Sequence, residues 1–125
     1  MEHPLKTLWE KPSRLVIGFM SGTSADGVDA ALVRITGYGT QTRAEQLGFC
    51  FVPFSDEVRA EILRLAGGGL ASAADFCRMN FLLGELFCEA GEALCAQTGT
   101  RLSDIDLIGS HGQTFWHIPE KEEYL

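Results

Sequence analysis

The feature that most constrains this chain is a pair of apolar segments separated by one short polar loop, in RLVIGFMSGTSADGVDAALVRITG. The first segment, about 14–21, is rich in branched and aromatic residues and predicts a buried strand. The second segment, about 28–36, has the same character and ends before Gly37 and Gly39. Strands joined by so short a loop pair antiparallel, so we predict that the core begins with a hairpin.

Two further strands are predicted. The third lies at about 43–52 and is ended by Pro53, which gives an antiparallel meander of three strands. The fourth lies within DIDLIGSHGQT and follows the helical part of the chain, so it could pair parallel with an earlier strand through a right-handed crossover. The order strand, strand, strand, helix, helix, strand indicates the α/β class, with a helix layer against a mixed sheet.

Two helices are predicted between the third and fourth strands. Ser55 is a candidate N-cap for a helix at about 56–66, which AGGGL ends. Ser72 with Asp75 resembles a capping box that opens a longer helix, which ends near 97–99. Apolar residues of this longer helix recur every three or four positions and predict a stripe facing the core: Phe76, Met79, Leu83, Leu86, Phe87, Ala90 and Leu94.

Length and composition predict one folded domain. The chain has 125 residues, of which 46% are hydrophobic and 22% charged, as in globular proteins. Residues 1–13 contain two prolines and mixed charge, so we expect a flexible lead-in before a domain at 14–125. Four cysteines without a CxxC pair predict buried free thiols in a reducing compartment: Cys50, Cys77, Cys88 and Cys95.

Charge and hydropathy exclude some functions. The formal net charge is −7 and the ten basic residues are scattered, which argues against nucleic-acid binding, because phosphate neutralisation needs clustered Lys and Arg. The N-terminus has no apolar core of a signal peptide, and no segment approaches about 20 apolar residues, the length of a membrane span. We therefore predict a cytoplasmic protein without membrane association.

The loop SGTSADGVD has the composition of a phosphate site. Gly22 and Gly27 permit positive φ and let a ligand approach the backbone. Exposed N–H groups in such a turn bind anions, while Asp26 and Asp29 fit Mg²⁺ held between carboxylate and phosphate. This composition points to a nucleotide bound with a metal, and the loop's hydroxyl donors are Ser21, Thr23 and Ser24.

An ordinary hairpin turn is the alternative for this loop. The dipeptide DG is a strong hairpin signal, and Ser, Thr and Asp are common in turns. The loop lacks the GK[ST] of a Walker A sequence and does not match GxGxxG. The residue pattern alone leaves both interpretations open.

A second polar loop follows the fourth strand, in GSHGQTFWHIP at 109–119. Loops at strand ends commonly carry binding residues. Gln113 and Thr114 could hydrogen-bond a sugar hydroxyl or a phosphate, and His111 could orient a neighbour or donate to an oxygen. The alternative is a structural role, which is the more common one for a lone loop histidine.

The two loops together resemble a known family. IGFMSGTSADGVDAAL, followed about eighty residues later by IGSHGQTFWHIP, resembles the N-terminal part of the bacterial anhydro-N-acetylmuramic acid kinases, from about Arg14 to Pro119. The resemblance implies a ribonuclease-H-like lobe of the actin-like sugar-kinase ATPase fold. It implies an enzyme that uses ATP and Mg²⁺ to convert the small-molecule substrate 1,6-anhydro-N-acetylmuramic acid to N-acetylmuramic acid 6-phosphate during peptidoglycan recycling.

The resemblance also implies roles for individual residues. Asp26 is expected near the metal, and the second motif is expected to face the cleft through His111, Gly112, Gln113 and Thr114. Ala25 stands where the family usually has Met or Leu, with little effect expected on backbone contacts to phosphate. The family's ATP-binding loop maps onto Gly22, Thr23, Ser24, Ala25, Asp26, Gly27, Val28 and Asp29.

The general base of this family is expected in a GDFRxxD-like segment, and the 125 residues contain none. No residue of this chain is therefore assigned a catalytic role, and we predict that the chain alone has no kinase activity. Its expected partner is the C-terminal half of the enzyme or a second copy of the chain. The alternatives are a non-catalytic lobe that binds a nucleotide or a partner, and a truncated remnant without function.

Overall fold

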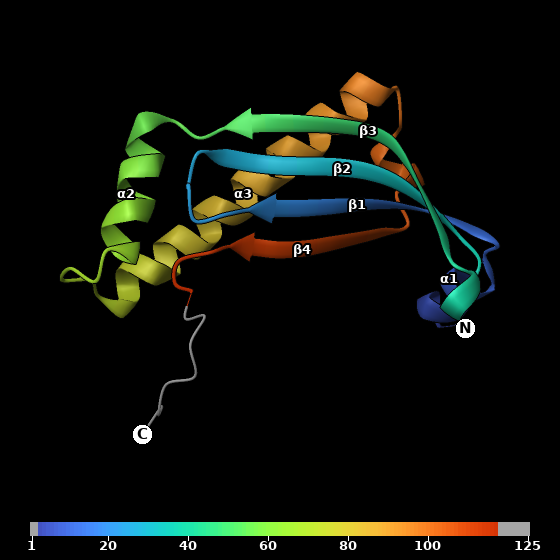
Figure 1. Cartoon of the computed structure of the whole chain (residues 1–125), viewed down its shortest axis with the longest axis horizontal. Coiled ribbons are helices and arrows are strands. Elements are labelled where there is room, and N and C mark those ends of the chain that lie inside the picture. Colours follow the sequence, from blue (N-terminus) through green and yellow to red (C-terminus); the bar gives the residue numbers. More distant parts are fainter. Residues whose placement is uncertain (1–2, 118–125) are drawn as a thin grey trace.

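A meander of three antiparallel strands forms the centre of the computed structural model, which describes residues 3–117 (Figure 1). The strands are β1 (Ser13–Ser21), β2 (Gly27–Thr36) and β3 (Arg43–Pro53). A fourth strand, β4 (Leu107–Gln113), pairs in parallel with β1, so the sheet has the order β3-β2-β1-β4. The predicted mixed α/β class, meander and parallel fourth strand are confirmed.

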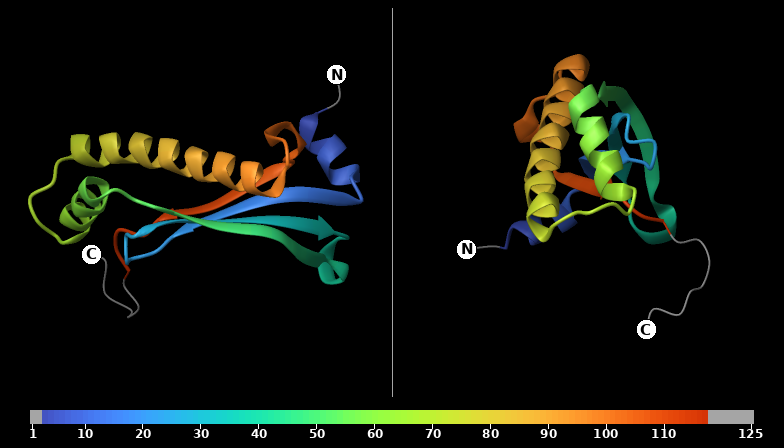
Figure 2. Two further views of the ribbon diagram at one scale, coloured as in Figure 1. Left: turned by 90° about the horizontal axis from the view of Figure 1, so that it is seen from above. Right: turned by 90° about the vertical axis from the view of Figure 1, so that its left-hand side faces the viewer.

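Two helices pack beside this sheet. α3 (Ala73–Thr98) lies along one face, and α2 (Asp56–Ala66) lies at the end where β1 and β4 finish (Figure 2). The predicted bounds of α2 are confirmed, and the Ser55 side chain accepts from the Val58 amide as its N-cap. The other face of the sheet carries no helix in the described part of the chain. No helix of that part combines the length and apolar character needed to cross a membrane.

The core lies between the sheet and α3. Alternate residues of β1 and β2 face the helix because side chains of a strand alternate between its two faces. Phe19 packs edge-to-face on Phe87 with ring centroids 5.6 Å apart. Most of the predicted helical stripe is buried, although Phe76 is half-exposed. The buried residues of this layer are Ile17, Phe19, Val28, Ala30 and Leu32 from the sheet and Met79, Leu83, Phe87, Ala90 and Leu94 from α3.

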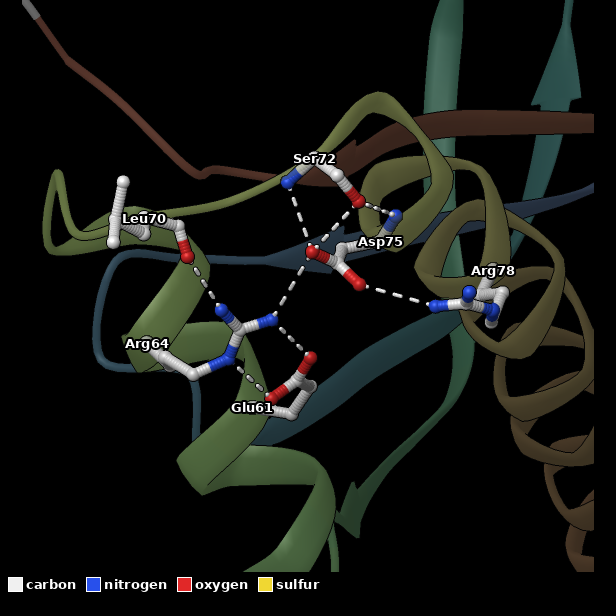
Figure 3. Close-up of polar contacts among 6 residues, drawn as sticks. All are labelled: Glu61, Arg64, Leu70, Ser72, Asp75 and Arg78. Atoms are coloured by element: carbon white, nitrogen blue, oxygen red, sulfur yellow. Dashed lines mark hydrogen bonds and ion pairs between the residues drawn. The ribbon is translucent and has the colours of Figure 1, made fainter.

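A polar network ties the end of α2 to the start of α3 (Figure 3). Arg64 forms two bonds to the Glu61 carboxylate, at 2.7 and 2.8 Å, and donates to the Leu70 carbonyl at 2.9 Å. The predicted capping box is present, with Asp75 accepting from the Ser72 amide at 2.9 Å. That backbone hydrogen bond, followed by the Ser72 hydroxyl, lowers the pKa of Asp75. The network therefore fixes the connection between the two helices.

Residues 1–13 contain more structure than the sequence suggested. A seven-residue helix, α1 (Pro4–Glu10), precedes β1. The Arg14 side chain donates to the carbonyls of Leu8 and Trp9, at 3.0 and 3.3 Å, and lies over the Tyr38 ring. These contacts attach the segment to the sheet, and its flexibility stays a prediction.

The cysteine prediction was wrong in part. All four thiols are free, and burial raises the pKa of Cys50 and Cys95. Cys77 and Cys88, however, are exposed on α3. The sequence pattern did not separate them from the buried thiols, because they flank the core-facing stripe of the same helix.

Candidate functional site

The two polar loops meet at one end of the sheet. β1 and β4 run parallel, so their carboxyl ends lie at the same edge (Figure 1), where ligands commonly bind in α/β sheets. Ser21, the last residue of β1, is paired with Gln113, the last residue of β4. Residues 22–26 follow the first strand and residues 114–117 follow the second.

Residues 22–26 form a tight turn whose conformation differs from the expected one. The Ala25 amide donates to the Gly22 carbonyl at 3.1 Å, and Ala25 has a positive φ of 50°. Gly22 and Gly27, which permit a positive φ, do not adopt one in this turn. Glycine is needed at 27 for space instead, because a Cβ there would overlap the Val52 carbonyl and lie 2.6 Å from a Phe51 ring atom.

The predicted phosphate-loop residues divide into a buried and an exposed set. Ala25 and Val28 are each 1% exposed and belong to the hydrophobic core, so their side chains are unavailable to a ligand. Gly27 is buried as well. The side chains that reach solvent in this loop are those of Thr23, Ser24, Asp26 and Asp29.

Four amides of the loop are available to an anion. Within the described residues, the backbone N–H groups of Gly22, Thr23, Ser24 and Asp26 donate to no protein acceptor. The Asp26 carbonyl, by contrast, accepts from the Phe54 amide at 2.9 Å, which attaches the loop to the segment between β3 and α2. A turn that is fixed at its base and has free N–H groups at its tip is a suitable anion site.

Ser21 does not have the role that we predicted for it. Ser21 is 1% exposed, and its hydroxyl lies 2.6 Å from the Gly27 carbonyl and 2.6 Å from Gln113 Oε1, so it is not a donor to phosphate. The sequence held the signal for this, because Ile17, Phe19 and Ser21 alternate along one strand and must share the core-facing side. Ser21 is therefore a structural residue of the site and not the hydroxyl donor to phosphate that its place in the polar loop suggested.

The carboxylates of the loop suit a hard cation. Asp26 is exposed, and its Oδ1 accepts from the Ser24 hydroxyl at 2.8 Å. Magnesium in phosphate sites is held by one or two carboxylates, with phosphate oxygens and water completing its shell. No cluster of three metal-ligating side chains occurs within residues 3–117. The donor set present therefore fits Mg²⁺ that arrives with a polyphosphate rather than a cation held by protein alone.

The second motif forms a bulge at the end of β4. Between Phe19 and Ser21 the register advances from Ser110 to Gln113, so β4 contains one extra residue. Gly112, with φ of 74°, supplies the left-handed conformation of this bulge. His111 is exposed at this point and Gln113 is directed toward the first loop.

The amide of Gln113, which could hydrogen-bond a sugar hydroxyl or a phosphate by its residue type, bonds to the protein's own backbone. Its Nε2 donates to the Gly22 carbonyl at 2.8 Å and to the Thr114 carbonyl at 3.0 Å. The Thr114 amide donates to the Ser21 carbonyl at 3.1 Å. The two motifs are therefore joined directly, and of the predicted residues in the second motif only His111 is fully exposed.

A groove of about 790 Å³ lies between α3 and β4. Its walls are mostly apolar, and its polar lining residues are Asn80 of α3 and Ser110 and Gln113 of the second motif. Residues 22–29 are not part of its lining. The groove suits an apolar partner better than a phosphate. Other lining residues include Phe76, Leu83, Phe87, Cys88, Ile108 and Phe115.

The fold and the site define an α/β domain whose polar loops lie together at the carboxyl ends of two neighbouring parallel strands. A sequence model of the family described as anhydro-N-acetylmuramic acid kinase matches residues 14–125. The chain therefore belongs to this family, as the resemblance of its two motifs implied.

Individual relatives agree with this assignment. The chain is 50% identical over 115 residues to the anhydro-N-acetylmuramic acid kinase of Caldanaerobacter subterraneus subsp. tengcongensis, an alignment that covers 92% of this chain and 29% of the relative. It is 40% identical over 107 residues to the kinases of the same name from Bacillus thuringiensis subsp. konkukian and Bacillus cereus strain AH820, covering 86% of this chain and 28% of each. The chain thus spans less than a third of the length of these relatives.

Proposed function

We propose that this chain is the ATP-phosphate-binding part of an anhydro-N-acetylmuramic acid kinase. One observation carries the proposal: the free amides of Gly22, Thr23, Ser24 and Asp26 lie together on a turn at the carboxyl end of a central strand. Backbone N–H groups of this kind bind phosphate without any basic side chain, which suits a chain with a net charge of −7. We infer further that the domain is a ribonuclease-H-like lobe of the actin-like ATPase fold.

Magnesium enters this proposal through Asp26. Its exposed carboxylate would hold the ion beside the phosphates, and Asp29 is a second exposed carboxylate three residues along the chain. When bound, Mg²⁺ neutralises charge that develops on the transferring phosphoryl group. The Ser24 hydroxyl orients Asp26 by donating to Oδ1.

The substrate and the partner follow from the family. We propose that 1,6-anhydro-N-acetylmuramic acid is phosphorylated in the cytoplasm during peptidoglycan recycling, and that His111, Gly112, Gln113 and Thr114 border its cleft. His111 is the residue of this motif that is free to face a substrate. The partner is the C-terminal half of the enzyme or a second copy of the chain. Ile108, 64% exposed on β4, supports a polypeptide partner at this strand, because exposed apolar edges favour association.

A non-catalytic lobe that binds Mg-ATP is the second candidate. The same free amides support it, because anion binding by a turn requires neither a general base nor a second lobe. The two candidates differ in turnover alone, so they are separated by activity and not by binding.

Thermal unfolding with and without Mg-ATP tests the proposed function. Specific binding to the folded chain raises the midpoint, and a ligand at ten times its Kd stabilises by roughly 1.4 kcal/mol. We expect Mg-ATP to raise the midpoint more than ATP with EDTA does. We expect Asp26→Asn to abolish that difference, while Glu92→Gln, a change at an exposed carboxylate of α3, keeps it. An unshifted midpoint at millimolar Mg-ATP would favour the remnant without function.

A further inference from the structure

We infer that Gln113 is a positioning residue that holds the phosphate loop in its binding conformation, rather than a residue that contacts the ligand. The inference rests on the proposed function of this loop. Gln113 comes from β4, about ninety residues along the chain from the loop, yet its side chain reaches the loop's first residue, Gly22.

The donors of Gln113 are fully used. A primary amide has two N–H groups, and Nε2 donates one to the Gly22 carbonyl at 2.8 Å and the other to the Thr114 carbonyl at 3.0 Å. No donor is left for a phosphate or a sugar hydroxyl. A direct ligand contact would require one of these bonds to break.

The acceptor atom of Gln113, Oε1, is connected to the other end of the loop, at Gly27, through the Ser21 hydroxyl. The buried Ser21 hydroxyl lies 2.6 Å from Gln113 Oε1 and 2.6 Å from the carbonyl of Gly27, the first residue of β2. The hydroxyl has a single proton, which it donates to one of these two acceptors at a time. Gly22 and Gly27 bracket the turn, so one glutamine side chain links both of its ends.

The orientation of this amide is fixed by its neighbours. A reversed amide would place Oε1 against two carbonyl oxygens, those of Gly22 and Thr114, without a proton between them. Glutamate at this position would face the same two oxygens with a carboxylate. The site therefore requires glutamine itself, and not merely a polar side chain of similar length.

The bulge in β4 makes this contact possible. The extra residue between Ser110 and Gln113 brings Gln113 into register with Ser21. Gly112 permits the bulge through its φ of 74°. The second motif thus contributes to the site by supporting the first motif. This support fixes the free amides of the turn in place before an anion binds.

The test compares Gln113→Ala and Gln113→Glu with the matched control Gln97→Ala. Gln97 also donates to a backbone carbonyl, that of Phe49 at 3.0 Å, but on another part of the surface. The ligand-free readouts are the amide chemical shifts of residues 22–27 and the hydrogen exchange of the Ala25 amide, which donates to Gly22. The ligand readout is Mg-ATP affinity by titration.

We expect both Gln113 variants to shift the loop resonances and speed Ala25 exchange without ligand. The affinity for Mg-ATP should fall about tenfold, because the net contribution of one hydrogen bond that holds the loop is lost. Gln97→Ala should change none of these. Affinity lost with unchanged ligand-free loop resonances would show direct contact and overturn the inference, as would wild-type behaviour of Gln113→Glu.

Two further arms keep the test decisive. Ser21→Ala removes the hydroxyl that lies between Gln113 Oε1 and the Gly27 carbonyl, and leaves both Nε2 bonds of Gln113 in place. It should shift the Gly27 end of the loop, and it replaces Gln113→Ala if that variant does not fold. If the unmodified chain binds no Mg-ATP, the proposed function fails. The ligand-free measurements still decide whether Gln113 holds the loop.

Discussion

The 125-residue chain, supplied with Mg-ATP and 1,6-anhydro-N-acetylmuramic acid, is expected to release ADP at less than about 0.01 s⁻¹, a hundredfold below the lower end of typical kinase rates. The chain spans 29% of the Caldanaerobacter relative and contains no GDFRxxD-like segment for the expected general base. Phosphoryl transfer depends on positioning both reactants, and the proposed role of the loop at 22–26 is to position only the phosphates. A coupled ADP-release assay measures this.

Adding the remaining part of a family kinase as a separate polypeptide completes the experiment. If that addition restores turnover, and Asp26→Asn in this chain abolishes it, the chain is part of a kinase and not a non-catalytic lobe that binds Mg-ATP. If the chain alone turns over at a rate within a hundredfold of a typical kinase, the reaction does not need a general base from outside these 125 residues, and our prediction is wrong.

Replacing Gly27 by alanine is expected to destabilise the fold strongly. The added Cβ would overlap the Val52 carbonyl and lie 2.6 and 2.7 Å from two atoms of the Phe51 ring. The carbonyl belongs to a paired strand and cannot move without breaking the β2–β3 ladder. Overpacking of this kind costs roughly 1–3 kcal/mol or more in the free energy of unfolding. Urea denaturation monitored by circular dichroism measures the loss.

Gly18→Ala is the matched control for this substitution. Gly18 also lies inside a strand, but a Cβ there meets nothing within 4 Å. We expect this variant to unfold at the wild-type urea concentration or slightly above it, since alanine restricts the unfolded chain more than glycine does. Equal midpoints for Gly27→Ala and Gly18→Ala would contradict the packing role of Gly27.

Strands and helices of this chain were predictable because their signals are local. Apolar alternation, the Ser55 cap and the capping box at Ser72 depend on residues within one or two turns of one another. Their bounds agree with the structure to within about one residue. α1 was missed because two prolines and mixed charge concealed a single short helix, which contacts Arg14 and, outside the reach of any local signal, Tyr38.

The site was predictable in location but not in detail. Parallel pairing of β4 with β1 brings the two motifs together, and the sequence indicated both strands. The left-handed residue is Ala25 and not a glycine, because burial of its methyl group in the core determines the turn. The engagement of Gln113 depends on a one-residue bulge in β4, and a register shift of this kind has no signal in the sequence alone.

Backbone amide resonances followed during a titration with Mg-ATP show whether the turn binds the phosphates. We expect the amides of Gly22, Thr23, Ser24 and Asp26 to shift more than any others, because they are the free donors of the turn. AMP, which lacks the β- and γ-phosphates, should leave them nearly unchanged. Saturable Mg-ATP binding that leaves these amide resonances unchanged, with shifts elsewhere on the surface, would show that the phosphates do not bind at this turn.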